Sequence, residues 1–79
     1  MITRTPQIHL IYSTDQWLSN ESRKLVYIGE EIEDCLASCV AYKGMTKEQA
    51  QMCRERSQSQ CTGNEVEWIV EHTFLNAFV

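Results

Sequence analysis

The hydrophobic period of this 79-residue chain changes near Glu30, and that change restricts the fold more than any other feature. Before it lie two short segments that are rich in β-branched and aromatic residues, as strands are. After it, apolar side chains recur at the spacing of one helical face, at Ile32, Cys35, Leu36, Cys39 and Val40. A chain of this length is enough for one domain, so we expect residues 1–79 to form a single α+β domain.

The two early segments predict strands over residues 7–13 and 24–29, joined by a long polar loop over 14–22. Side chains alternate across a strand, so Ile8, Leu10 and Tyr12 share one face and Ile11 lies on the other. We expect the face with Ile8, Leu10 and Tyr12 to be the core face. A loop longer than a tight hairpin turn is a place to look for function.

Two helices follow, with a turn at Gly44. Four acidic residues crowd the first turn of the first helix, where negative charge meets the positive end of the helix dipole. Thr46 and Gln49 have the spacing of a capping box at the start of the second helix. We expect the inner face of that helix to carry Ala50, Cys53, Ser57 and either Gln60 or Cys61, and the helix to end at residues 62–64.

The last segment, residues 65–79, fits two structures. Its apolar residues follow helical spacing, yet Val66, Trp68 and Val70 also alternate with polar neighbours, and the segment is dense in β-branched and aromatic residues. A third strand would complete a sheet that one layer of helices can cover, so we predict a strand. The expected fold is β-β-α-α-β, a three-stranded, mostly antiparallel sheet with a helical hairpin on one face.

Four cysteines, Cys35, Cys39, Cys53 and Cys61, lie in the two-helix stretch and are nearly symmetric about its turn. They are compatible with buried core thiols, with two disulfides joining Cys35 to Cys61 and Cys39 to Cys53, or with a four-cysteine zinc site. The spacing between Cys53 and Cys61 is wide for zinc, so we expect no metal site. The carboxylates beside Cys35 should keep it a protonated thiol rather than a nucleophile.

Charge and composition narrow the function classes. The net charge is −4 and no basic stripe is present, which disfavours binding to nucleic acid. No segment has the length and hydropathy of a membrane span or of a signal peptide, so we expect a cytoplasmic protein that does not bind membranes. His9 and His72 have no catalytic context, and no phosphate-binding or nucleophile motif occurs. We expect neither enzymatic activity nor a cofactor.

Trp17 lies in the polar loop between the two early strands, flanked by Asp15 and Leu18. An exposed tryptophan there could anchor a protein partner, since aromatic residues dominate interface hot spots. Alternatively, it could fold back over the edge of the sheet or the ends of the helices. We take Asp15, Trp17 and Leu18 as the candidate partner-binding residues.

Three stretches of the chain form a further pattern: the end of the first strand and its loop (Tyr12-Ser13-Thr14-Asp15-Gln16-Trp17-Leu18-Ser19), the stretch Gln58-Ser59-Gln60, and the final segment from Ile69-Val70-Glu71 to Leu75-Asn76. With this pattern the chain resembles small uncharacterised ββααβ proteins of phages and gut Bacteroidetes. The resemblance implies the fold and an origin in a mobile element, and it supplies no functional residues. We expect a non-enzymatic protein-interaction module, in one version a phage accessory protein that inhibits host defence. The alternatives are a disulfide-stapled secreted or periplasmic module, a zinc-stabilised binding domain, and a self-associating protein.

Overall fold

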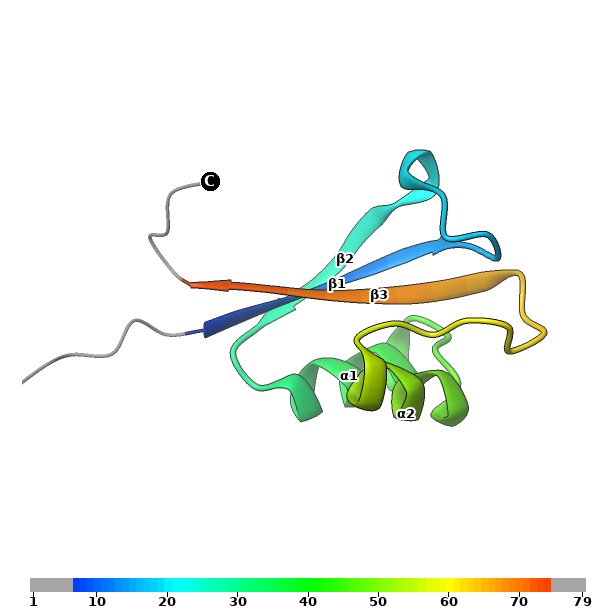
Figure 1. The fold of residues 1–79 in the computed structure, drawn as a ribbon. Coiled ribbons are helices and arrows are strands. Elements are labelled where there is room, and N and C mark those ends of the chain that lie inside the picture. The colour runs from blue at the N-terminus through cyan, green and yellow to red at the C-terminus, as the bar shows by residue number, and fades with distance from the viewer. Residues whose placement is uncertain (1–6, 75–79) are drawn as a thin grey trace, which may run out of the picture.

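The computed structural model describes residues 7–74, and its order of elements is the predicted β-β-α-α-β. Both helices lie on the same face of the sheet (Figure 1). The longer helix has 11 residues, and no helix in the described part of the chain is long and apolar enough to cross a membrane. The elements are β1 (Gln7–Asp15), a 3-10 turn (Asn20–Ser22), β2 (Lys24–Gly29), α1 (Ile32–Tyr42), α2 (Lys47–Arg56) and β3 (Val66–Phe74).

The sheet is antiparallel with the order β2-β1-β3, so β1 is its central strand. The ambiguous last segment is a strand as far as Phe74, and the remainder of that prediction lies outside the described residues. β3 pairs with β1 along its whole length, from Gln7 opposite Phe74 to Asp15 opposite Val66. This long pairing resolves the sequence ambiguity, because it satisfies the backbone groups of β3 through a strand more than fifty residues away.

The predicted core face of β1 is wrong. Ile11 is fully buried under the helices, whereas Leu10 and Tyr12 are only half-buried. The alternation within β1 favours the other face, because Ile11 has His9 and Ser13 as its neighbours on its own face. The partner strand decides: Ile11 lies opposite Val70, and on the other face Leu10 lies opposite Glu71. The face that bears Ile11, Trp68 and Val70 is the one that can be buried.

A β-bulge in β2 places two consecutive side chains toward the core. The register shifts between Ile11, which pairs with Tyr27, and Tyr12, which pairs with Leu25. Val26 is the extra residue, and both it and Tyr27 pack against the core. Leu25 and Ile28 consequently point away from the helices, where they are 48% and 57% exposed.

The turn after α1 and the start of α2 agree with the prediction, and the end of α2 does not. The first turn of α1 holds two of the four acidic residues expected there, Glu33 and Asp34. Thr46 and Gln49 form a complete capping box, and Gly44 has φ +82° after the end of α1. The sequence predicts that α2 continues toward Cys61, but the helix ends at Arg56, and Ser57 after it adopts a left-handed conformation. The residues after it pair with the outer edge of β3, through Ser59 N–H to Trp68 O (2.8 Å) and Val70 N–H to Ser57 O (2.7 Å). That pairing replaces another helical turn.

Candidate functional site

The loop between β1 and β2 is built around the carboxylate of Asp15. Its Oδ1 accepts hydrogen bonds from the backbone N–H groups of Trp17 and Ser19, each at 3.0 Å, and its Oδ2 accepts from the Ser19 hydroxyl at 2.6 Å. These donors stabilise the charged form, the Ser19 hydroxyl most strongly, and they hold the pKa of the Asp15 carboxyl below its usual value. Asp15 therefore fixes the path of the backbone on both sides of Leu18.

A second set of bonds ties the far end of the loop to β1. The Ser22 and Thr14 hydroxyls lie 2.6 Å apart, and Thr14 is buried. Ser22 Oγ also accepts from the Asp15 N–H at 2.9 Å and donates to Ser19 O at 2.8 Å. With this bracing Leu18 holds a left-handed conformation, φ +57°, which residues other than glycine rarely adopt.

The structure brings the three predicted binding residues together and gives each a different position. Asp15 lies inside the turn, Leu18 is half-buried, and Trp17 is 76% exposed. The alternative that Trp17 folds back over the sheet edge or the helix ends is wrong, because most of its surface is exposed. The loop projects from the sheet on the side away from the helices (Figure 1). The fixed backbone thus carries an indole that almost nothing in the described chain covers.

A buried polar cluster joins α2, the segment after it and β3. The Glu67 carboxylate accepts from the hydroxyls of Ser59 and Thr62, both at 2.7 Å, and from the Thr62 N–H at 3.1 Å. The Gln49 side chain donates to Val66 O at 2.7 Å and accepts from the Trp68 indole at 2.9 Å. Within residues 7–74, no buried side-chain nitrogen or oxygen lacks a partner.

The charge state of Glu67 follows from that environment. Burial raises the pKa of the Glu67 carboxyl, but the hydrogen bonds from Ser59, Thr62 and Gln49 outweigh it, and the pKa lies below its usual value. The sequence predicts Gln49 only as a capping residue and does not predict this cluster. Its one visible signal is a glutamate at the start of an apolar strand, and that signal does not identify partners elsewhere in the chain.

All four cysteines are free thiols, and neither predicted pair is bonded. Cys35, Cys39 and Cys53 are buried in the core, whereas Cys61 is exposed. The pairing of Cys35 with Cys61 assumed that α2 continues past Ser57, and the early end of α2 leaves Cys61 in the following loop instead. The structure therefore has the first of the three arrangements, a set of packed core thiols.

Burial also sets the reactivity of these thiols. It raises the pKa of Cys53 to about 12 and is the main reason that the pKa values of Cys35 and Cys39 are raised. Asp34 and Glu31 raise that of Cys35 further, in the predicted direction. Among residues 7–74, no group of three His, Cys, Asp or Glu side chains is placed to hold a metal ion, so the zinc-stabilised alternative has no ligand set there.

The two histidines, far apart in sequence, lie opposite each other in β1 and β3. Their ring centroids are 6.3 Å apart, and His9 Nδ1 lies 3.2 Å from the Glu30 carbonyl oxygen. This contact links His9 of β1 to the backbone at Glu30, between β2 and α1.

Comparisons with known proteins identify no relative. No family model matches the chain, and no curated protein sequence or solved structure is significantly similar to it. The functional argument therefore depends on the described side chains alone.

Proposed function

We propose that this chain is a protein-interaction module that does not catalyse a reaction. It binds another protein through the loop between β1 and β2 that carries Trp17, the Trp17 loop. The observation that carries the proposal is the 76% exposure of Trp17 on a backbone fixed by Asp15. Immobilising a flexible loop costs binding free energy, and a loop that is ordered in advance avoids most of that cost. Tryptophan is also one of the residue types that are enriched at interface hot spots.

The state of the nucleophilic side chains supports binding over catalysis. A reactive cysteine needs a lowered pKa, and burial raises the pKa values of Cys35, Cys39 and Cys53. Free thiols fit a reducing compartment, which makes the cytoplasm the proposed location. The narrower version of the proposal is a phage accessory protein that blocks a host defence protein. It rests on the resemblance to small phage proteins, and it makes host defence proteins the first partners to look for.

The direct experiment compares Trp17→Ala with a matched control, Tyr42→Ala. Tyr42 is an equally exposed aromatic residue, at 83%, but it lies at the end of α1. Immobilised protein is incubated with lysate of the native host, and the recovered proteins are quantified by mass spectrometry. We expect Trp17→Ala to lose a specific partner that Tyr42→Ala and the wild type retain. Equal recovery by all three would rule out the loop as the binding surface.

Two further measurements separate the indole from the loop that holds it. Trp68 is 2% exposed, so burial of Trp17 by a purified partner should dominate any blue shift of the tryptophan emission.

The Asp15→Ala variant keeps the indole but removes the acceptor of three loop hydrogen bonds. We expect it to bind roughly tenfold more weakly because the loop must then be ordered on binding. Unchanged affinity of Asp15→Ala would contradict the role given to loop order.

A further inference from the structure

Helix α1 carries no charged side chain from Cys35 to Tyr42, although only part of its circumference faces the sheet. Cys35 and Cys39 are fully buried against the sheet, whereas Ala37 and Ala41 are exposed to solvent. A helix on the surface of a two-layer domain usually has charged or polar residues on its outer side. α1 is therefore apolar over a wider arc than its contact with the sheet requires.

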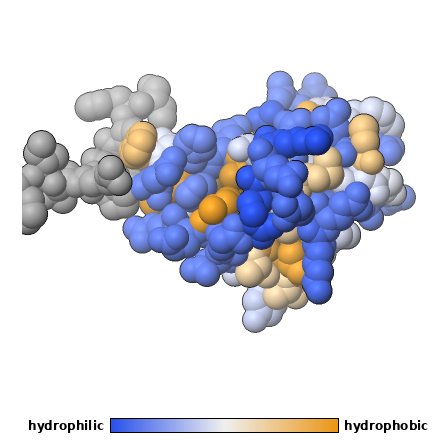
Figure 2. All heavy atoms as spheres, turned by 60° about the horizontal axis from the view of Figure 1, so that its bottom comes forward, coloured by the Kyte–Doolittle hydropathy of each residue, from blue (hydrophilic) through white to orange (hydrophobic). Residues whose placement is uncertain are grey.

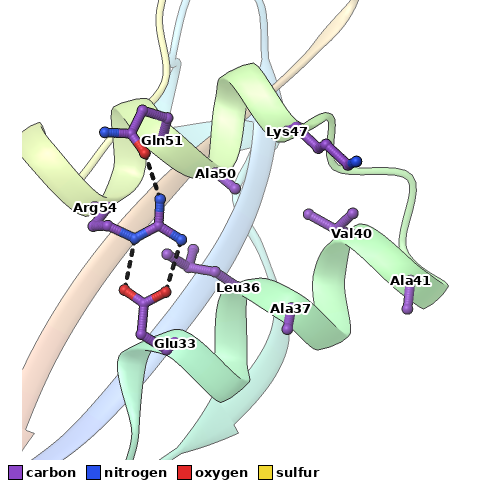
Figure 3. A pocket seen from close by; sticks show the side chains of 9 residues that line it. All are labelled: Glu33, Leu36, Ala37, Val40, Ala41, Lys47, Ala50, Gln51 and Arg54. Atoms are coloured by element: carbon purple, nitrogen blue, oxygen red, sulfur yellow. Dashed lines mark hydrogen bonds and ion pairs between the residues drawn. The ribbon is translucent and has the colours of Figure 1, made fainter.

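The outer apolar side of α1 borders a groove of about 450 Å³ between the two helices. Buried Leu36 and Ala50 form its floor, and Val40 lies half-buried beside them. Figure 3 shows these side chains directed into the space between α1 and α2. In the space-filling view, apolar side chains interrupt the hydrophilic surface on this side of the molecule (Figure 2).

The two ends of the groove differ in charge. At one end Glu33 and Arg54 form a two-point ion pair, with distances of 2.6 and 2.7 Å, and Gln51 accepts a further bond from Arg54. At the other end Lys47 lies next to Val40 (Figure 3), and Ala41 also lines the groove. Lys47 forms no ion pair within residues 7–74. The charges at the Glu33 end are paired with each other, whereas the Lys47 end carries an unpaired positive charge.

An unpaired anion lies on α1 itself. Asp34 is exposed and precedes Ala37 by three residues and Ala41 by seven, so the three share one helical stripe. Asp34 also forms no ion pair within the described residues. The stripe therefore begins with a negative charge at Asp34 and continues with apolar residues to Ala41, about 10 Å further along α1. Lys47 of α2 lies at that second end of the groove.

We propose that this surface binds a second copy of the chain, with the two α1 helices packed antiparallel across a twofold axis near Ala37. That arrangement places Asp34 of each copy beside Ala41 and Lys47 of the other. The outer apolar sides of both α1 helices then cover each other. Two ion pairs form, each between Asp34 of one copy and Lys47 of the other. A twofold interface uses the same patch on both subunits, so the patch has to be self-complementary, as this one is.

The identity of the occupant follows from the same observations. The groove needs an apolar helix with an acidic end, and the chain itself supplies one. The centre of such an interface should lack charge, as residues 35–41 do. The Trp17 loop lies on the opposite side of the sheet from the helices (Figure 1), so pairing through α1 leaves it free in both copies.

The first test measures mass by sedimentation across roughly a hundredfold range of concentration. We expect the wild type to approach twice the chain mass and Ala37→Arg to remain a monomer. Ala37 is exposed and arginine is a good helix former, so this variant should fold, which circular dichroism checks. A wild type that stays monomeric throughout, or an Ala37→Arg variant that associates as tightly, would overturn the proposal and leave the groove to another partner.

The second test uses charge reversal. Lys47→Glu and Asp34→Lys should each weaken self-association at least about tenfold, since each creates two like-charge contacts. A mixture of the two variants should form a heterodimer, because both contacts are then attractive again. The control is Lys24→Glu, which changes the net charge equally on β2 and should leave association intact. If the mixture does not recover, or if Lys24→Glu weakens association as much, the antiparallel arrangement is wrong.

Discussion

Cys61 differs from the other cysteines in exposure, the property that controls thiol reactivity here. We expect a thiol reagent at neutral pH to modify Cys61 quickly in the native protein. Cys35, Cys39 and Cys53 should react only as the chain unfolds, because burial hinders access and raises their pKa values. A colorimetric thiol count should find one fast thiol in the native state and four in denaturant.

Two controls accompany this count. Cys61→Ser should abolish the fast phase, and the intact mass should not change on reduction, as is true of a chain without disulfides. Two or more fast thiols in the native wild type would show that the core opens readily, and a mass that rises on reduction would restore the disulfide-stapled alternative.

The loop residues show how far single residues can be predicted. Asp15, Trp17 and Leu18 could be selected from the sequence because a tryptophan in a polar stretch is visible without knowing its neighbours. The bonds that make the loop rigid could not, since Ser22 reaches back seven residues to the Asp15 N–H. Gln49 and Glu67 are eighteen residues apart and meet only after α2 and β3 are in place.

At the scale of elements, the contact between β2 and α1 depends on a missing side chain. A Cβ built on Gly29 would lie 2.8 Å from Cys35 Sγ, closer than packed atoms approach. Gly29→Ala should therefore destabilise the domain by about 1–3 kcal/mol through overpacking. Denaturant unfolding monitored by circular dichroism measures this change.

The cause can be isolated by a double-mutant cycle. Cys35→Ala removes the sulfur, so combining it with Gly29→Ala should cost less than the sum of the two, by about 1 kcal/mol. Cys53→Ala is the matched control, because Cys53 is not among the nearest neighbours of a Cβ at position 29. The destabilisation by Cys53→Ala should therefore simply add to that by Gly29→Ala. Additivity with Cys35→Ala would mean that the two elements are free to separate.

The second element-scale prediction concerns Glu67, which attaches the segment after α2 to β3. Glu67→Gln puts an amide donor against the Ser59 and Thr62 donors and should cost about 1–3 kcal/mol in unfolding free energy. Glu65→Gln, an exposed neighbour, should change stability little. Urea unfolding of the wild type and both variants provides the comparison.

The pH dependence of the Glu67 effect has a definite sign. The pKa of Glu67 in the folded state lies below its ordinary value of 4.5, so its contribution is present above about pH 4.5 and is lost as the pH falls through the folded-state pKa. The stability difference between wild type and Glu67→Gln should narrow in acid. A difference that stays constant or widens there would mean that Glu67 is not held ionised by its donors.

The accuracy of the fold prediction depends on the range of the interactions involved. The capping box of Thr46 and Gln49 spans three residues and was predictable, as was the turn at Gly44. The end of α2 was not, because Ser57 and Ser59 leave the helix to pair with Val70 and Trp68 of β3. The same reason explains the wrong core face of β1, which is decided by residues of β3.

For the whole molecule, the choice of core face determines how much stability there is to lose. A single core in a domain of this size rarely supplies more than about 3–5 kcal/mol. Ile11 is fully exposed in the unfolded chain and fully buried at the centre of that core, so Ile11→Ala should cost about 2–5 kcal/mol, most or all of the margin. Leu10 is half-buried on the face without helices, so Leu10→Ala should lower the free energy of unfolding by only about 1 kcal/mol.

We therefore expect Ile11→Ala to be largely unfolded near room temperature, while Leu10→Ala keeps the native circular dichroism and a cooperative thermal transition. The two substitutions are adjacent and remove side chains of the same size, so their difference reports the face and not the position along β1. Equal losses would mean that the second face of the sheet is also covered in solution. A larger loss for Leu10→Ala would put the core on the face first predicted from the alternation of Ile8, Leu10 and Tyr12.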